Sequence, residues 1–259
     1  RYWGNWVLKK VKAEIGDLYP LIPDPTDKAK RSELQPDWFK EHGSDDVPPG
    51  YLMPVAYLWT RTVKCKNPTC GATVPLVRQT WLCNKDRRYV AMKMVAPRGK
   101  KEVRFDVVEA TSENGLGFDP ASFSKAGNAA CPFCETVADS AYVKEYGASP
   151  GYGVQPMAVM VVRPGRQGKL YLAATPEYFA VDTAAARILT VEKASGLCGP
   201  SEPLEPNPRS FDIQRYGFTH WRMAFTDRQI ATHLCIAAQL NSVLSDLKQI
   251  YPARWEALA

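Results

Sequence analysis

The sequence predicts an α+β protein: an antiparallel β-rich domain flanked by an N-terminal helix and a long C-terminal helix. Apolar residues recur at helical spacing near both ends of the chain, and the segments between them alternate at period two. Two pairs of cysteines stand at turn spacing among those alternating segments. The predicted organisation is an N-terminal helix over residues 1–20, a linker over 21–50, a β-rich insert domain over 51–205 and a C-terminal helical segment over 206–259.

An amphipathic helix is predicted over residues 2–16, ended by a glycine and a nearby proline. Its apolar stripe consists of Trp3, Val7, Val11 and Ile15. Lysines lie largely off this stripe. The stripe needs a surface to pack against, either from the rest of the chain or from another domain.

The linker over residues 21–50 is rich in proline, aspartate and lysine, with at most a short helix near Trp38. Aromatic and β-branched residues then predict strands. The predicted strands are 55–63, 73–77, 80–82, 89–95, 102–108, 155–162 and 169–173. The last two are expected to form a hairpin, and residues 97–100 form a turn. Together the strands of residues 55–108 predict a ribbon built around a metal.

Two further helices are predicted towards the C-terminus. One spans residues 176–187 and opens with a proline. A proline-rich stretch over 196–210 follows as a boundary. The second helix spans 226–250, where Thr226 and Gln229 have the spacing of a capping box. Its predicted buried face is Ile230, Leu234, Ala237, Asn241, Leu244 and Leu247.

The paired cysteines predict a structural zinc site and make the β domain zinc-ribbon-type. Cys65 and Cys70 bracket four residues, and Cys131 and Cys134 bracket two. A tight turn can aim two thiolates at one ion, so two such turns can complete a tetrahedral Zn²⁺ site. The span between the pairs must leave the metal and return to it. The alternatives are two unrelated reduced pairs, or disulfides in a secreted protein.

The remaining cysteines, Cys83, Cys198 and Cys235, have no partner at turn spacing and are expected to be ordinary small residues. No signal peptide is visible and seven cysteines are an odd number, so we expect reduced thiols in a cytoplasmic protein. No apolar run has the length of a membrane span. The chain begins with Arg1 rather than Met, which suggests a processed or excised segment.

The formal net charge is +6, and a zinc ion held by four thiolates would bring it to about +4. This mild basicity is compatible with nucleic acid but does not establish it. Basic residues concentrate around the first cysteine pair and the predicted hairpin tips. They are Arg61, Lys64, Lys66, Arg78, Lys85, Arg87, Arg88, Arg98, Lys100 and Lys101, with Trp59, Trp81 and Tyr89 among them. Our candidates for contact with double-stranded DNA are Arg61, Lys64, Lys85, Arg87, Arg88 and Lys100. The alternative is a solvated face on a structural or protein-interaction module.

The stretches WGNWVLKKVKAEIGDLYP, PVAYLWTRTVKCKNPTCGATVPLVRQTWL, CPFC and YGFTHWRMAFTDRQIATHL follow one another in that order. Together they resemble the middle of large adenine-specific DNA methyltransferases that contain a zinc ribbon and an N-terminal domain of unknown function numbered 1156 (DUF1156). In that family the positions of Cys65, Cys70, Cys131 and Cys134 match the zinc-ribbon cysteines. The position of Cys83 is usually a serine.

The resemblance also implies what this segment lacks. The family's glycine-rich S-adenosylmethionine motif lies upstream of the segment matching Trp3, and its Asp-Pro-Pro-Tyr motif lies downstream of that matching Thr226. The stretch Val47-Pro48-Pro49-Gly50-Tyr51 resembles the second motif, but a valine replaces its polar residue and a glycine interrupts it, so we predict a turn. The chain is therefore expected to be a central segment that cannot methylate alone, with the remaining methyltransferase domains and DNA as partners.

Overall fold

The computed structural model describes residues 2–26, 47–123, 127–163, 165–179, 184–205 and 213–251. The short helix expected near Trp38 lies outside these ranges. The chain divides into two compact units. The helical unit comprises Arg1–Leu52, Ala180–Pro203 and His220–Ala259, and the sheet unit comprises Met53–Phe179 and Leu204–Thr219.

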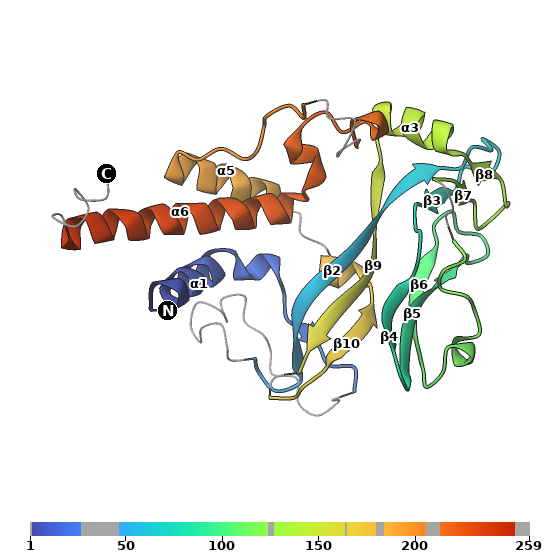
Figure 1. The fold of residues 1–259 in the computed structure, drawn as a ribbon, viewed down its shortest axis with the longest axis horizontal. Helices are drawn as coiled ribbons and strands as arrows, with labels where there is room; N and C mark the ends of the chain where they lie inside the picture. Colours follow the sequence, from blue (N-terminus) through green and yellow to red (C-terminus); the bar gives the residue numbers. More distant parts are fainter. Residues whose placement is uncertain are drawn as a thin grey trace. The chain divides into compact units, whose positions relative to one another are not determined.

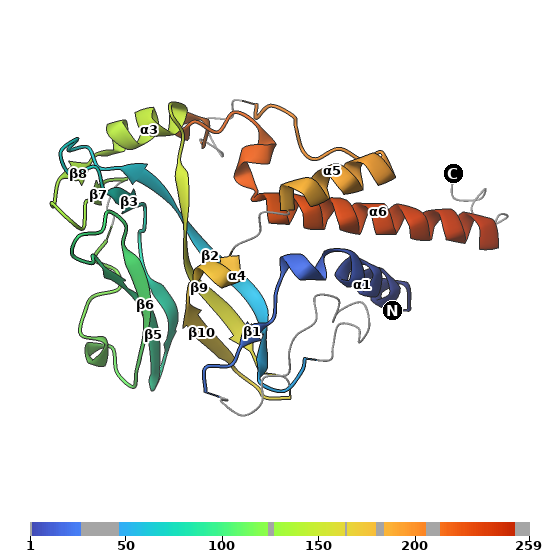
Figure 2. The same ribbon diagram turned by 180° about the vertical axis from the view of Figure 1, so that it is seen from behind.

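Among the described residues of the helical unit, three α-helices pack together: α1 (Tyr2–Ile15), α5 (Ala184–Ser195) and α6 (Asp227–Ile250). Figures 1 and 2 both show α1 and α5 lying along α6. The predicted stripe of α1 is confirmed, since three of its residues are buried and Trp3 packs against the same core. The buried residues of this core are Val7, Val11, Ile15, Leu18, Ala184, Ile188, Val191, Ile230, Ala231, Leu234, Cys235 and Val243. The surface that this stripe needed is therefore supplied by the chain itself.

Polar contacts fix α1 against the other two helices. The Cys235 thiol donates to Glu14 Oε2 over 3.2 Å, and Gln239 Nε2 donates to the same oxygen over 3.1 Å. Burial raises the pKa of Cys235 to about 12, so this thiol is an inert packing residue, as predicted. Arg187 of α5 donates to the Glu14 carbonyl of α1 and forms an ion pair at 2.7 Å with Asp17, in the short 3-10 turn that follows α1.

The start of α6 is confirmed, whereas its buried face is corrected. Thr226 and Gln229 form the predicted reciprocal capping box. Of the predicted face, Ile230 and Leu234 are buried, but Asn241 and Leu244 are exposed. The buried set instead includes Ala231, Cys235 and Val243, because α1 and α5 both pack on α6.

The structure describes helix at both ends of the predicted segment 176–187, as α4 (Pro176–Phe179) and as α5, which continues to Ser195. Residues 180–183 between them are outside the described ranges. The sequence placed residues 184–203 in the β-rich domain, but α5 packs with α1 and α6 because its Ile188 and Val191 join their core. Apolar periodicity shows that a helix has a buried face without showing which surface covers it.

The long strand β2 (Tyr51–Lys64) pairs with three of the described strands, one after another along its length. Its first two residues pair with β1 (Ile22–Pro23), and from Met53 it runs antiparallel to β9 (Gly153–Val162). Its last residues pair with β3 (Thr73–Pro75). The hairpin of β9 and β10 (Lys169–Ala173) is confirmed. The predicted turn before β2 is also present, with the Tyr51 N–H donating to the Pro48 carbonyl over 3.2 Å.

A separate three-stranded antiparallel sheet consists of β4 (Trp81–Lys85), β5 (Arg88–Val95) and β6 (Arg104–Ala110). Met92 and Phe105 of this sheet share a buried cluster with Met157 and Ala158 of β9. The strands predicted between residues 80 and 108 are thus present, but they pack on β9. They form an excursion from the cysteine pairs and do not surround them.

Candidate metal centre

Cys65 and Cys70 lie in the turn that joins β2 to β3, which we call the first knuckle (residues 65–70). The Cys65 N–H donates to the Ala72 carbonyl over 2.7 Å, extending the β2–β3 pairing to the cysteine itself. The Cys70 N–H donates to the Asn67 carbonyl over 3.1 Å. Gly71 then has a φ of +60°, a conformation that glycine adopts without strain. The sequence Cys-Lys-Asn-Pro-Thr-Cys-Gly therefore closes a turn with both sulfurs on one side.

Cys131 and Cys134 lie in the second knuckle (residues 131–134), between β7 (Ala129–Ala130) and β8 (Val137–Ala138). These short strands pair antiparallel. The Cys131 N–H donates to the Thr136 carbonyl, and the Glu135 N–H donates to the Cys131 carbonyl, both over 2.9 Å. Glu135 has a φ of 61°, which reverses the chain after the second cysteine. Each cysteine pair thus lies at the tip of its own hairpin.

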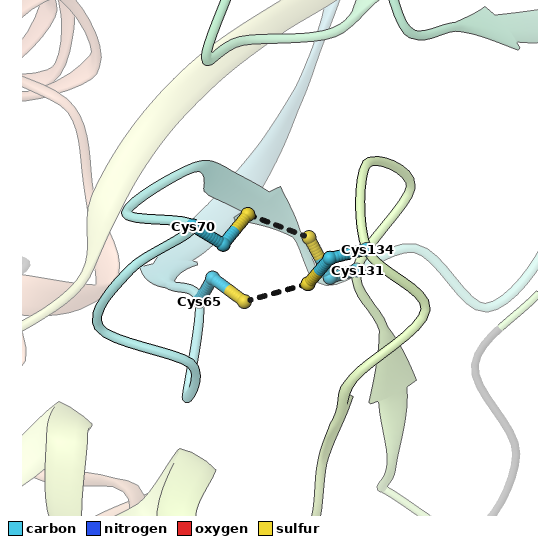
Figure 3. A group of neighbouring side chains, drawn as sticks. All are labelled: Cys65, Cys70, Cys131 and Cys134. Carbon is cyan, nitrogen blue, oxygen red and sulfur yellow. Dashed lines mark hydrogen bonds between the residues drawn. The ribbon is translucent and has the colours of Figure 1, made fainter.

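The four sulfurs converge on one point (Figure 3). All four lie within 4.8 Å of one another, and the cluster could hold a metal ion. The Cys65–Cys134 sulfur distance is 3.5 Å and the Cys70–Cys131 distance is 3.8 Å. Tetrahedral thiolates with a Zn–S bond of about 2.3 Å would have sulfurs about 3.8 Å apart. The predicted pairs are therefore brought together at a spacing suited to a tetrahedral ion, and the alternative of two unrelated pairs is wrong.

All seven cysteines are free thiols in the structure. Cys83 lies on β4, Cys198 in an exposed loop and Cys235 on α6, and none of them belongs to the described cluster. Their prediction as ordinary residues agrees with these positions.

Apolar side chains pack against the cluster from within the sheet unit. Cys65 and Cys131 are 5% and 1% exposed, whereas Cys70 and Cys134 are partly exposed. The buried residues around them are Val63, Ala72, Val74, Ala129, Ala138 and Val143. The centre is therefore part of a small core in which each hairpin contributes apolar residues beside its cysteines.

The sulfur environments differ in their electrostatics. Burial raises the pKa of Cys65 to about 12 and also raises that of Cys131. Hydrogen bonding with the Thr136 hydroxyl, 3.3 Å from the sulfur, lowers the pKa of Cys134 to about 6. Without a cation the protein thus holds protons on its buried thiols and has a thiolate at Cys134 near neutral pH. A divalent ion would have to displace the buried protons.

Helix α3 (Ser140–Ala148) ties the two knuckles together. Its N-cap residue Asp139 accepts a hydrogen bond from the Tyr142 N–H over 2.9 Å. The same carboxylate lies 2.5 Å from Lys66 Nζ, and this pairing lowers the pKa of Asp139. The Tyr142 hydroxyl donates to the Lys64 carbonyl over 3.0 Å. This helix is not among the predicted elements, although Asp139 at the N-cap position is a usable signal for it.

The candidate DNA-contacting residues do not form one cluster. Lys85, Arg87 and Arg88 lie at the β4–β5 turn, and Lys100 lies in the turn at the opposite end of β5. The eight residues of β5 separate the two turns by roughly 23 Å. The second turn adjoins the first knuckle, because Lys101 Nζ donates to the Cys70 carbonyl over 2.6 Å.

Several of these basic side chains contact other parts of the sheet unit. Arg61 lies over the Phe218 ring at 5.3 Å, and Lys64 Nζ donates to the Thr73 hydroxyl over 3.1 Å. Arg88 pairs with Glu109 at 3.0 Å and donates to the Lys169 carbonyl over 2.7 Å. Lys85, Arg87 and Lys100 are exposed.

The fold and the site define a protein of mixed helix and antiparallel sheet with a four-cysteine cluster that could hold a metal ion. No family model, no curated protein and no solved structure matches the chain. Among the described helices, none is long and apolar enough to cross a membrane.

Proposed function

We propose that the four cysteines bind one structural zinc ion in a zinc-ribbon-type domain, and that the chain is the central segment of an adenine-specific DNA methyltransferase. The observation that carries the zinc assignment is the convergence of four sulfurs from two hairpins. Thiolates favour Zn²⁺ among common divalent ions. Four protein ligands fill a tetrahedral shell and leave no position for substrate or water, so the ion is structural rather than catalytic.

The methyltransferase assignment depends on the resemblance of the cysteine-bearing stretches and of the segment leading into α6. The cofactor and target-amine motifs of that family are expected in other segments of the parent protein, as are the partner domains. We therefore expect no binding of S-adenosylmethionine by this chain alone. Calorimetric titration with the cofactor measures this, and saturable micromolar binding would contradict the assignment.

Contact with duplex DNA is the role we propose for the exposed basic residues. Lysine and arginine side chains that neutralise phosphates release counterions, so binding should be sequence-independent and steeply salt-dependent. Lys85 and Arg87 suit this role because both are exposed at one turn. Arg87 Nε lies 3.9 Å from Asp86 Oδ2, and the Arg87 side chain is 90% exposed.

A salt titration of duplex binding tests this role. The double variant Lys85→Ala/Arg87→Ala should bind more weakly to every duplex, and the slope of log affinity against log salt should fall by up to about two. The matched control is Lys9→Ala/Lys193→Ala, which removes the same charge from exposed positions of the helical unit. Equal losses in both variants would indicate a net-charge effect rather than a contact site.

A non-catalytic scaffold is the second candidate. The intramolecular pairs of Lys66 with Asp139 and of Arg88 with Glu109 favour it, since these charges are partly neutralised within the unit. A scaffold predicts that the wild type and both double variants give identical titration curves. The remaining methyltransferase domains would then be the partners.

A further inference from the structure

The sheet unit contains a pocket of about 380 Å³ beside Trp59–Arg61, the part of β2 that precedes the first knuckle. This volume lies at the small end of the range of roughly 300–1,000 Å³ that is typical of ligand sites. Aromatic rings make up much of its wall. The lining includes Trp59, Thr60, Arg61, Tyr152, Tyr216 and Phe218.

The aromatic wall is combined with positive charge. The Arg61 guanidinium lies 5.3 Å from the centre of the Phe218 ring. Lys144 Nζ lies 5.4 Å from the centre of the Tyr216 ring. Among the described residues that line the pocket, none carries a carboxylate. The pocket wall therefore combines aromatic rings with a planar cation, and the described residues that line it bring no carboxylate.

Close backbone packing holds this wall in place. The segment Tyr216-Gly217-Phe218 lies directly against Gly147 of α3. A β-carbon added to Gly147 would overlap the Tyr216 carbonyl oxygen and the Tyr152 hydroxyl. Gly217 has a φ of +86°, which directs the two flanking aromatic residues from one turn. The Tyr152 hydroxyl donates to the Val143 carbonyl over 2.9 Å, and this hydrogen bond fixes the Tyr152 ring.

We propose that this pocket binds an unpaired nucleobase of single-stranded nucleic acid. Bases stack on aromatic rings and on arginine guanidinium planes, and their phosphates are attracted to nearby cations. The charge selects this occupant over an aromatic side chain of a peptide, because the base arrives on a negatively charged strand. The inference goes beyond the proposed function, since it requires only the folded sheet unit and neither methyl transfer nor duplex contact.

The test measures binding of the full chain to a short single-stranded DNA that carries one 2-aminopurine. A second single strand of the same length, with an abasic site in place of the 2-aminopurine, is measured separately for comparison. The base-bearing strand should bind more tightly, and its fluorescence should be quenched by stacking. Phe218→Leu removes the π face but retains apolar volume, and should weaken binding roughly 5- to 150-fold. Phe218→Tyr retains the face and should bind as the wild type does. Tyr2→Leu, which removes an exposed aromatic ring from α1 in the helical unit, is the matched control and should change nothing.

Arg61→Gln provides a second variant should Phe218→Leu fail to fold, and it should lose the preference for the base-bearing strand. A ribonucleotide strand of the same sequence identifies which nucleic acid supplies the base. Equal affinity for the abasic and base-bearing strands would overturn the proposal. So would binding of N-acetyltryptophanamide in the pocket with no response to either strand.

Discussion

The pKa of Cys134 is shifted in the opposite direction from those of Cys65 and Cys131. Hydrogen bonding with Thr136 lowers its pKa to about 6, whereas burial raises the pKa values of Cys65 and Cys131. A metal can bind only the thiolate form of each side chain. The charged form of Cys134 is thus already favoured when a cation arrives, whereas the buried thiols must lose their protons to solvent before they can bind it.

This difference predicts how zinc affinity depends on pH. Between about pH 6 and 8, binding should release at least two protons, from Cys65 and Cys131, so affinity should fall about tenfold per pH unit for each as the solution is acidified. Below about pH 6, Cys134 should release a further proton and steepen the dependence. Competition with a chromophoric chelator at several pH values measures the slope. An affinity independent of pH between 6 and 8 would contradict this account.

Gly147, in the last turn of α3, lies directly against the Tyr216 backbone and the Tyr152 hydroxyl. Gly147→Ala should lower the free energy of unfolding by about 1–3 kcal/mol, because its methyl group meets the Tyr216 backbone and the Tyr152 hydroxyl. Gly4→Ala is the matched control, a glycine in a helix with nothing within 4 Å of an added β-carbon. That change should raise stability by about 0.5–1 kcal/mol. Denaturant unfolding compares the two variants. Destabilisation by both would contradict the explanation that close packing around Gly147 causes the loss.

At the level of elements, the sequence correctly predicted the features that depend on residues close together in the chain. The stripe of α1, the capping box of α6 and the β9–β10 hairpin depend on residues a few positions apart, and all three are confirmed. The cysteine cluster was predictable because thiol chemistry constrains which residues must meet. The position of α5 and the separation of the basic turns were not, because both depend on contacts between distant segments.

At the scale of the whole molecule, the metal should matter to one unit and not to the other. The two hairpins of the centre share a core in the sheet unit, whereas the core of the helical unit contains none of its four cysteines. Removing zinc with a chelator should therefore expose the amides of residues 63–75 and 129–143 to hydrogen exchange. Amides of α6 around residues 230–243 should keep their protection. Uniform loss of protection would indicate that the two units unfold together.

The central claim is one structural zinc ion held by four cysteines, and elemental analysis tests it most directly. Protein purified without chelator should contain one equivalent of zinc, and Cys134→Ser or Cys70→Ser should lose it or become insoluble. Cys83→Ser, which alters a cysteine on β4 outside the cluster, should retain the full equivalent. Soluble wild-type protein without zinc, or with iron in its place, would contradict the account.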